Sequence, residues 1–469
     1  MYFQQFFLSC LAHASYMIGS EGVAAVVDPQ RDVEIYLEDA RQQGYRIAHI
    51  IETHLHADFV SGHLELAART GATIHISGRA AATFPHHAVR EGDEVRFGRA
   101  VLRFLETPGH TIESLCVLVS DLDRSPDPFA VLTGDTLFIG DVGRPDLSPD
   151  HTPQQLAAML YDGLHEKLLR LPDAVEVYPA HGAGSLCGRN ISPERRSTIG
   201  QERVRNYALQ SMSRDAFVRM LTSDLPLRPD YFLRDAELNR GGAAPLAELP
   251  PLAGLSPGRV LDAQYRGAVV LDTRPAADFG TAHVPGAVHI ALSGQYASWA
   301  GILLGLDSRI VLVAEDPARL EESRMRLARV GIELILGYLE GGVLAWERAG
   351  MPLARTPQIS VQDLAAAMND SGFALQVVDV RKLPEWEAGH VEGAVLMPLD
   401  RLSAALPNGL DTARPVAVHC KSGYRSSIAT SVFRRAGFKE VWNVVGGFDA
   451  WLAQKLPFHT AESASATRK

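Results

Sequence analysis

His54, His56 and Asp58 alternate along a short segment that follows the apolar run 47–51. The apolar run predicts a buried strand, so the three side chains belong to the loop that leaves it. Imidazole and carboxylate groups on one loop can converge on a single metal ion. The next residue, Phe59, has no donor atom, whereas a site for two metals would carry another ligand at this point. The segment therefore predicts one metal ion rather than two.

Three more segments with potential metal ligands each follow an apolar run. They are 107–111 with His110, 134–136 with Asp135, and 178–182 with His181. Loops at strand ends can return such side chains to a common cleft. A lone histidine is more often a hydrogen-bonded structural residue, but an ordered set of four together with two aspartates favours a metal site. His75, His86 and His87 belong to no such motif, and for them we expect structural roles.

The composition places limits on the function. The 469 residues are 46% hydrophobic and 21% charged, which is typical of a globular chain of about three domains. The net charge of −10, without a basic run, argues against nucleic acid and anionic membrane surfaces as partners. The four cysteines are too scattered for a disulfide framework, and no apolar run reaches the length of a membrane span. The apolar N-terminus is a poor signal peptide, because it has no Lys or Arg up to Ile18. We therefore expect a reducing, cytoplasmic setting.

Short apolar runs and helical patterns alternate through the first part of the chain. The predicted strands are 22–27, 47–52, 73–76, 101–105, 115–119, 131–133 and 175–178, and the predicted helices are 33–43, 63–70 and 153–171. This alternation predicts an α/β sandwich with functional loops at the strand ends. Residues 192–239 form a charged helical pattern that we expect to cap this domain, and the Gly- and Pro-rich stretch 241–257 is typical of a linker.

Beyond the linker the chain contains an internal duplication. The segments 272–274 and 379–381, both Asp-x-Arg, are each followed eleven residues after the Asp by a His-Val-x-Gly-Ala segment. A Gly-Gly pair followed by a Trp also recurs, at 341–346 and 446–451. A period of about 106 residues at three landmarks predicts two copies of one small α/β domain with a largely parallel sheet.

Cys420 lies in a loop after the apolar run 416–418 and before a helical pattern. Gly423 lets successive backbone N–H groups curl around the sulfur, and the positive end of the following helix points at it. Lys421 and Arg425 add positive charge. Because these features stabilise a thiolate or a persulfide anion, we predict a reactive cysteine rather than the commoner buried, inert one.

The four ordered segments of the first domain resemble the metallo-β-lactamase fold, over most of residues 1–190. Within that superfamily the chain is more similar to the persulfide dioxygenases, which hold one Fe(II). The resemblance implies an αββα sandwich domain over 1–245, with one Fe(II) per chain bound by His54, His110 and Asp135. Two histidines and one carboxylate on one face leave positions open for O₂ and a substrate sulfur. The residues that would then orient the ligands and a bound water are His56, Asp58, Asp146 and His181.

Two further residues enter through the same resemblance. Arg144 matches an arginine near the thiol-substrate pocket, and a guanidinium can pair with a carboxylate such as those of glutathione. The alternative is that Arg144 only ties down its loop through Asp146. Cys187 follows a Gly-rich loop that the resemblance places near the metal cleft, where it either helps to pass a sulfane sulfur or simply packs. The sequence leaves both choices open.

The CxxGxR loop around Cys420 resembles that of the rhodanese sulfurtransferases, over about residues 357–457, and the repeated landmarks fit that fold too. The resemblance implies an active α/β rhodanese domain over 356–460 with a mainly parallel sheet. The residues that it places at the catalytic site are Cys420, Lys421, Gly423 and Arg425.

The first copy, 250–355, lacks this thiol. Alignment on its strand puts Glu315 at the place of Cys420, and a carboxylate cannot accept a sulfane sulfur. We expect an inactive rhodanese-like module that spaces the active domains or builds an oligomer interface. For the residues that follow the second copy, 461–469, we expect a disordered tail.

The whole chain resembles the three-domain persulfide dioxygenase–sulfurtransferase fusions of bacterial sulfide detoxification. The resemblance implies that a low-molecular-weight persulfide, of glutathione or a similar thiol, reacts with O₂ and water to give the thiol and sulfite. Cys420 would carry a second sulfane sulfur to sulfite, which produces thiosulfate. We expect a homo-oligomer, either a dimer or a tetramer. Two alternatives stay open: a glyoxalase II-type thioester hydrolase with two zinc ions, and a sulfur-carrier or docking platform in which the metal is structural.

Overall fold

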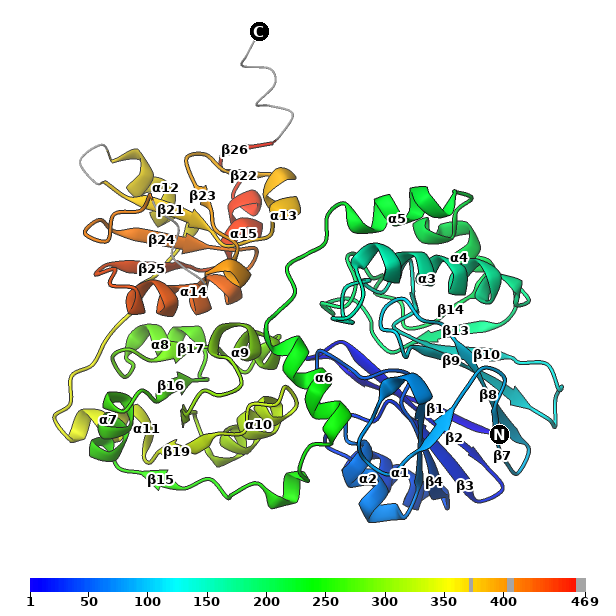
Figure 1. Ribbon diagram of the computed structural model, residues 1–469. Helices are drawn as coiled ribbons and strands as arrows, with labels where there is room; N and C mark the ends of the chain where they lie inside the picture. The colour runs from blue at the N-terminus through cyan, green and yellow to red at the C-terminus, as the bar shows by residue number, and fades with distance from the viewer. Residues whose placement is uncertain (371–373, 403–408, 461–469) are drawn as a thin grey trace, which may run out of the picture. The chain divides into compact units, whose positions relative to one another are not determined.

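The computed structural model describes residues 1–370, 374–402 and 409–460 (Figure 1). The chain forms two compact units, Met1–Pro250 with Ala328–Gly331, and Pro251–Leu327 with Ile332–Lys469. The expected disordered tail, 461–469, lies outside the described residues.

The first unit is built around two six-stranded sheets (Figure 1). The first sheet has the order β1-β2-β3-β4-β5-β6, with β1 (Tyr2–Leu8), β2 (His13–Ser20), β3 (Val23–Val27), β4 (Arg46–Ile51), β5 (Thr73–Ser77) and β6 (His87–Val89). The second has the order β14-β13-β10-β9-β8-β7, with β7 (Glu94–Phe97), β8 (Ala100–Glu106), β9 (Leu115–Asp121), β10 (Ala130–Gly134), β13 (Glu176–Pro179) and β14 (Ser197–Thr198). A short hairpin joins β11 (Leu137–Phe138) and β12 (Asp141–Val142).

Helices cover the outer face of each sheet, which completes the expected αββα sandwich. Those of the first unit are α1 (Glu34–Gln43), α2 (His63–Thr70), α3 (Pro153–Glu166), α4 (Ile199–Arg205), α5 (Arg214–Thr222) and α6 (Tyr231–Gly241). One apolar cluster joins α1 and α2 to the first sheet, and another joins α3 and α5 to the second. The region 192–239, for which a helical pattern was predicted, contains α4, α5 and most of α6, together with β14 and connecting loops.

The core between the sheets follows from the two-residue period of the strands. On β2, Tyr16 and Ile18 point into the cluster between the sheets, whereas Met17 points into the cluster under α1 and α2. Every residue of β2 is buried. The seven predicted strands are present. Among the strands that were not predicted is β2, which is buried along its whole length. A strand buried on both faces lacks the alternation of apolar and polar residues that marks a half-exposed strand.

The second unit contains two five-stranded sheets of the same order, β15-β19-β18-β16-β17 and β20-β25-β24-β21-β23. All strand pairs in both sheets are parallel, as the duplication predicts. The first copy has β15 (Gly254–Leu255), β16 (Val269–Asp272), β17 (Val288–His289), β18 (Ile310–Val313), β19 (Ile335–Leu339), α7 (Pro257–Tyr265), α8 (Ala276–Thr281), α9 (Tyr296–Leu304), α10 (Pro317–Ala328) and α11 (Gly342–Arg348). The second has β20 (Gln358–Ile359), β21 (Gln376–Asp379), β23 (Val395–Leu396), β24 (Val416–His419), β25 (Val441–Val444), α12 (Val361–Asn369), α13 (Leu383–Glu387), α14 (Tyr424–Arg435) and α15 (Gly447–Ala453), and β22 (His390–Val391) pairs with β26 (Phe458–His459).

The strand register corrects the alignment of the two copies by one residue. Asp272 pairs with Val313 in the first sheet, and its counterpart Asp379 pairs with His419 in the second. The residue after the strand is therefore Ala314 in one copy and Cys420 in the other, so the expectation that Glu315 occupies the place of the cysteine was wrong. Neither Ala nor Glu can form a persulfide, and the first copy still lacks the thiol.

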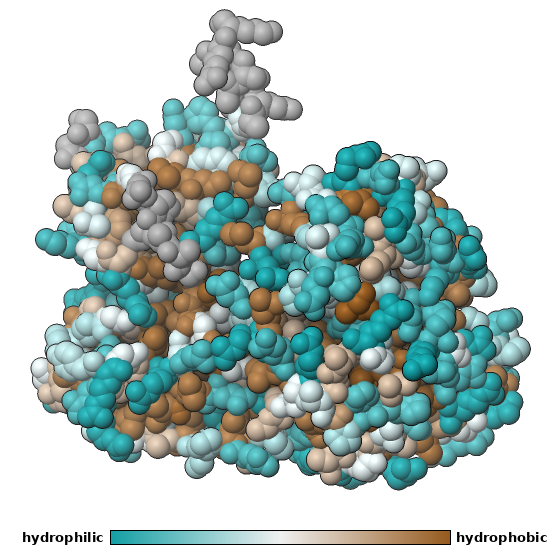
Figure 2. Space-filling model, viewed as in Figure 1, coloured by the Kyte–Doolittle hydropathy of each residue, from teal (hydrophilic) through white to brown (hydrophobic). Residues whose placement is uncertain are grey.

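No helix in the described part of the chain combines the length and the apolar character that a bilayer crossing requires. The face of the molecule in Figure 2 mixes hydrophilic and hydrophobic residues.

The packing of α5 against α3 gives a test of the first unit. Phe217 is fully buried, and its ring lies 5.4 Å from that of Tyr161 on α3. We predict that Phe217→Ala lowers the free energy of unfolding by about 3–5 kcal/mol, because the deleted ring leaves a cavity. Urea unfolding followed by circular dichroism measures this change. Val204, which is 75% exposed, provides the control, since Val204→Ala should change the value by less than about 0.5 kcal/mol. Equal unfolding curves for the two variants would contradict the assignment of this core.

Candidate metal centre and cysteine loop

The predicted metal-binding segments all lie at the carboxyl ends of strands. Asp135 follows β10, and the segments with His54, His110 and His181 follow β4, β8 and β13. Strands β8 and β10 are both antiparallel to β9, and β13 is parallel to β10. Three of these ends therefore meet at one edge of the second sheet, which brings their loops together.

The three predicted ligands place their donor atoms close together. One donor atom each from His54, His110 and Asp135 lies within 4.8 Å of the others, and all three side chains are buried. His54 Nε2 is 3.8 Å and His110 Nε2 is 3.4 Å from Asp135 Oδ2. None of these atoms has a hydrogen-bond partner among the described residues. Because buried polar atoms without partners are costly, the arrangement fits one metal ion at their meeting point.

Hydrogen bonds at the far side of each ring orient the two imidazoles. His110 Nδ1 lies 3.0 Å from the carbonyl oxygen of Arg144, which can only accept, so Nδ1 carries the proton and Nε2 has a free lone pair. Thr53 Oγ1 donates to Asp28 Oδ2 at 2.9 Å and can therefore accept from His54 Nδ1 at 3.0 Å. Burial lowers the pKa of both imidazoles, which favours the neutral form that binds metals.

Asp135 is held from behind by His181 and Asp58. His181 Nδ1 donates to Asp135 Oδ1 at 2.7 Å, while His181 Nε2 lies 2.9 Å from Asp58 Oδ2. Burial acts to lower the pKa of His181, but the two carboxylates raise it well above its usual range. Burial acts to raise the pKa of Asp135, but His181 and the other imidazoles bring it well below its usual range. The carboxylate is therefore ionised and presents Oδ2 to the metal position.

His56 is held away from this centre by two other carboxylates. Its Nε2 lies 3.3 Å from Asp28 Oδ1 and 3.5 Å from Glu52 Oε2, and all three side chains are buried. Burial acts to lower the pKa of His56, but Asp28 and Glu52 raise it overall. The raised pKa favours the ring protonated on both nitrogens, which offers no lone pair to a metal. That His56 supports the site without ligating stays a prediction.

Phe59, the apolar residue after Asp58, lies among histidine rings. Its ring is fully buried and packs against His13 at 4.2 Å and His56 at 4.4 Å between ring centroids. His13 is also buried, and neither of its ring nitrogens has a hydrogen-bond partner among the described residues. The sequence analysis did not select His13, because it precedes any recognisable motif.

A second group of donor atoms stands beside the first. Asp58, His181 and Cys187 place one donor atom each within 4.8 Å, and all are buried. Burial, together with Asp58 and Asp135, raises the pKa of the Cys187 thiol well above its usual range. Cys187 therefore lies next to the metal cleft, as expected, but as a protonated thiol. Its role in passing sulfur stays a prediction.

Arg144 is already bonded on every side of its guanidinium. It forms two hydrogen bonds to Asp146, at 2.7 and 2.9 Å, and donates to the carbonyl oxygens of Leu186 and Pro226. The side chain is only 3% exposed. This geometry favours the alternative in which Arg144 and Asp146 tie down the loop, and contact of Arg144 with a substrate stays a prediction.

Several positioning residues escaped the sequence analysis because they are distant in the chain. Asn239, near the end of α6, donates to the carbonyl oxygens of His56 and Phe59 at 2.7 and 2.8 Å. Glu113 accepts from the backbone N–H of Leu55 at 3.0 Å. Both are buried and hold the His54–Phe59 loop in shape. A lone Asn or Glu in a charged region carries no motif that could have revealed this role.

The cysteine loop of the second unit surrounds Cys420 as predicted. The backbone N–H of Gly423 donates to Cys420 Sγ at 3.1 Å, and α14 begins at the next residue. Gly423 has φ 106°, a left-handed conformation that suits glycine. Lys421 is exposed at the rim of the loop. A backbone donor and a helix N-terminus thus face the sulfur, an arrangement that stabilises negative charge on it.

Arg425 differs from the expectation. Its guanidinium forms two hydrogen bonds, both of 2.7 Å, with the carboxylate of Glu385 on α13. Glu385 therefore balances much of the charge that Arg425 was expected to add beside the sulfur. No sequence pattern predicts this pair, because 40 residues separate its partners.

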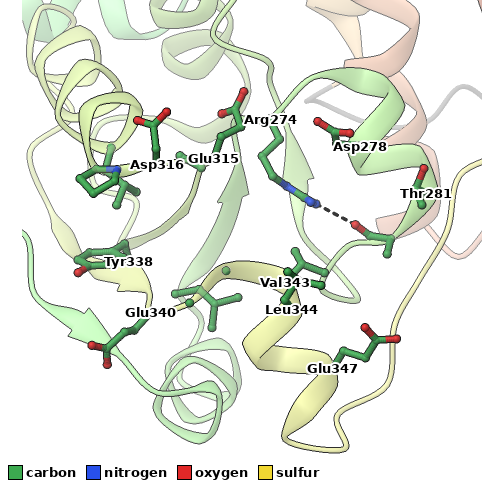
Figure 3. Close-up of a pocket in the computed structure, with 17 residues that line it drawn as sticks. Arg274, Asp278, Thr281, Glu315, Asp316, Tyr338, Glu340, Val343, Leu344 and Glu347 are labelled. Carbon is green, nitrogen blue, oxygen red and sulfur yellow. Dashed lines mark hydrogen bonds between the residues drawn. The ribbon is translucent and has the colours of Figure 1, made fainter.

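The first copy has a cavity of about 620 Å³ where its strand and helix ends meet (Figure 3). Its walls include the strand-end loop and the Gly-Gly pair of this copy, and carboxylates stand around it. The residues named in Figure 3 with acidic side chains are Asp278, Glu315, Asp316, Glu340 and Glu347. Arg274 donates to the carbonyl oxygen of Ala282 at 2.8 Å and is paired with Asp272. No cysteine lines the cavity, so it cannot carry a sulfane sulfur as Cys420 can.

The convergence of three donor atoms predicts that each ligand is needed for metal binding. We expect His110→Ala to weaken metal affinity more than about 100-fold, because two donors cannot hold the ion as three do. Metal analysis after dialysis against a weak chelator measures the loss. His87→Ala is the control, since His87 is exposed on β6 and outside the cluster. Full metal content in the His110→Ala variant would show that the ion is bound elsewhere.

Comparisons with known proteins identify two kinds of domain in the chain. The metallo-beta-lactamase superfamily model matches residues 8–181, and the rhodanese-like domain model matches residues 256–349 and 360–454. The chain is 28% identical over 214 residues to the mitochondrial persulfide dioxygenase ETHE1 of Bos taurus, covering 44% of this chain and 75% of the relative. It is 33% identical over 217 residues to a hydroxyacylglutathione hydrolase of Methylococcus capsulatus, covering 45% of this chain and 78% of the relative.

Among solved structures, a metallo-beta-lactamase from Staphylococcus aureus is 30% identical. The match covers 72% of this chain and 98% of that one, with a TM-score of 0.65. The chain belongs to the metallo-β-lactamase superfamily and carries two rhodanese-like domains after its metallo-β-lactamase domain.

Proposed function

We propose that the chain is a persulfide dioxygenase joined to a sulfurtransferase. The first activity converts a low-molecular-weight persulfide, O₂ and water into a thiol and sulfite: R–S–SH + O₂ + H₂O → R–SH + SO₃²⁻ + 2 H⁺. The second moves a sulfane sulfur through Cys420. One Fe(II) per chain, glutathione or a similar thiol as R–SH, and the cytoplasm as location belong to this proposal, as do the domain limits and the oligomer expected above.

One observation carries the first half of the proposal. The unpartnered donor atoms of His54, His110 and Asp135 converge, while the remaining nitrogen or oxygen of each is bonded to the protein. Two imidazoles and one carboxylate are the ligand set of many non-haem Fe(II) oxygenases. A ferrous ion held there would supply the binding of O₂ and sulfur and the redox chemistry that joins them. The similarity to a persulfide dioxygenase supports this choice of substrate.

Residues around the three proposed ligands limit the number of side chains that can bind the metal. Asp28 and Glu52 hold His56, and Phe59 fills the adjoining space with an apolar ring. His181 and Asp58 fix the orientation of Asp135 and leave only Oδ2 for the metal. Three protein ligands would leave the remaining coordination positions of a bound ferrous ion for two small reactants.

Cys420 supports the second half of the proposal. Its thiolate attacks the outer sulfur of a second persulfide, the S–S bond of the donor breaks, and the donor leaves as a thiolate. The resulting Cys–S–S⁻ is stabilised by the N–H of Gly423 and the start of α14. Sulfite then attacks the outer sulfur, so that thiosulfate leaves and the Cys420 thiolate is restored. No redox partner is needed for either transfer.

A thioester hydrolase with two metals is the second candidate. The cluster Asp58–His181–Cys187 and the similarity to a hydroxyacylglutathione hydrolase favour it. Two zinc ions per chain, with hydrolysis of S-lactoylglutathione, would support this candidate over the first.

The dioxygenase proposal predicts oxygen uptake that depends on iron. Protein purified without air and loaded with about one Fe(II) per chain should consume one O₂ for each glutathione persulfide and release one sulfite. Removal of the metal with a chelator should abolish the uptake, and Fe(II), but not Zn(II), should restore it, because zinc has no redox chemistry. An oxygen electrode with sulfite analysis measures both. An iron-loaded chain that consumes no oxygen would disprove the proposal.

Separate sites predict separable activities. Cys420→Ser should leave oxygen uptake and sulfite release unchanged, since the metal ligands belong to the first unit. It should reduce thiosulfate formation to background, because a hydroxyl cannot hold a sulfane sulfur. Chromatographic analysis of sulfite and thiosulfate distinguishes the products. Cys116→Ser, at a buried cysteine outside the cysteine loop, controls for loss of a thiol, and loss of both products in Cys420→Ser would contradict separate sites.

A further inference from the structure

Helix α14 follows the cysteine loop, residues 420–423. Along one face the helix contacts the first rhodanese-like copy, residues 250–355, which is the cysteine-free copy. Tyr424, Ser427 and Ser431 lie three and four residues apart, so they share that face. Tyr424 Oη donates to the carbonyl oxygen of Ala291 at 3.1 Å. Ser427 Oγ lies 2.9 Å from His289 Nδ1, and the N–H of His289 donates to Ser431 Oγ at 3.0 Å. Both copies belong to the second compact unit.

The segment 289–294 that makes these contacts is itself fixed. Arg326 on α10 donates to the carbonyl oxygens of Leu292 and Gly294, the latter at 2.7 Å. His289 Nε2 lies 2.8 Å from the carbonyl oxygen of Arg274, so it carries the ring proton. Nδ1 must then accept from the hydroxyl of Ser427. The cysteine-free copy thus presents a rigid surface with matching donors and acceptors to α14.

The cysteine loop is supported at both of its ends. At its start, the N–H of Phe448 donates to the carbonyl oxygen of Cys420 at 2.7 Å, and the N–H of Asp449 donates to that of Lys421 at 2.9 Å. These donors come from the loop's own domain. At its end, Gly423 binds the sulfur and is followed directly by Tyr424, whose contact belongs to the other copy.

We propose that the cysteine-free rhodanese-like copy positions the catalytic loop of its partner copy, with Tyr424 and Ser427 as the positioning residues. The segment 289–294 fixes the first two turns of α14, and this fixes the N–H of Gly423 relative to Cys420 Sγ. The copy therefore acts on sulfur transfer without a thiol of its own. The inference rests on the proposed transfer at Cys420 and assigns to the copy a role beyond spacing or assembly.

A glycine in the cysteine-free copy allows a test from outside the cysteine loop. Gly294 has φ +80°, and a methyl group added there would meet the ring of Tyr424 at 3.1 Å. Gly267 in the same copy has φ +85°, and nothing lies within 4 Å of its added methyl. The two Gly→Ala changes therefore carry similar backbone strain, but only Gly294→Ala presses on Tyr424.

We expect Gly294→Ala to lower kcat/KM for sulfur transfer from thiosulfate to cyanide by about three- to tenfold, the effect of one displaced hydrogen bond. Amide hydrogen exchange of residues 420–424, measured by mass spectrometry, should become faster, because the loop end loses its support. Gly267→Ala should match the unchanged protein in both measurements, even where its melting temperature falls. Oxygen uptake by the first unit should be equal in all variants.

Tyr424→Phe provides a second route if Gly294→Ala does not fold. It removes only the hydroxyl that bonds Ala291 and should lower kcat/KM by about two- to threefold, again with faster exchange of the loop. Unchanged turnover and exchange in Tyr424→Phe and Gly294→Ala would overturn the inference. Equal losses in Gly294→Ala and Gly267→Ala would also overturn it, because general destabilisation would then explain them. Absence of sulfur transfer in the unchanged protein would refute the proposed function instead, while the exchange comparison would still decide the positioning role.

Discussion

The metal centre depends on the two carboxylate oxygens of Asp135, which make different contacts. Oδ1 is bonded to His181, which is backed in turn by Asp58, while Oδ2 faces the free nitrogens of His54 and His110. All of these groups are buried, so their charges must be balanced within the protein rather than by water. A metal cation at the meeting point supplies that balance. His56 lies close to two carboxylates of its own, Asp28 and Glu52, which balance the charge of its ring.

In the second unit, negative charge on the sulfur of Cys420 is stabilised by the backbone rather than by a metal ion. Around Cys420 the donor is a backbone N–H, and the cationic side chain of Arg425 is already paired with Glu385. Backbone donors keep their geometry only if the chain that carries them is held in place. In this unit the support comes from α15 at one end of the loop and from the segment 289–294 at the other. The copy without a thiol thus contributes hydrogen bonds to the helix that follows Cys420.

The two rhodanese-like copies differ in the loop that follows the central strand, β18 in the first copy and β24 in the second. Their sheets have the same strand order, and equivalent aspartates occupy the same register. In one copy the strand end is followed by Cys420 and three further residues before the helix, and in the other by Ala314 and only two before Pro317. The shorter loop borders the acidic cavity of the first copy (Figure 3), whereas the longer one curls around the sulfur of Cys420.

The sequence by itself determined an α/β sandwich, the duplication and the residues that could do chemistry, and the αββα arrangement followed from the family resemblance. Local sequence patterns predict those features. The patterns are apolar runs, glycine pairs, and side chains at strand ends such as His54, Asp135 and Cys420. Tertiary structure alone decided which of these side chains meet. It joined Asp28 and Glu52 to His56, Glu385 to Arg425, and Ala291 to Tyr424. It also placed Ala314, not Glu315, at the cysteine position. The physical reason is that such partners are far apart in the chain, and their contacts follow from strand register and packing rather than from any periodicity in the sequence.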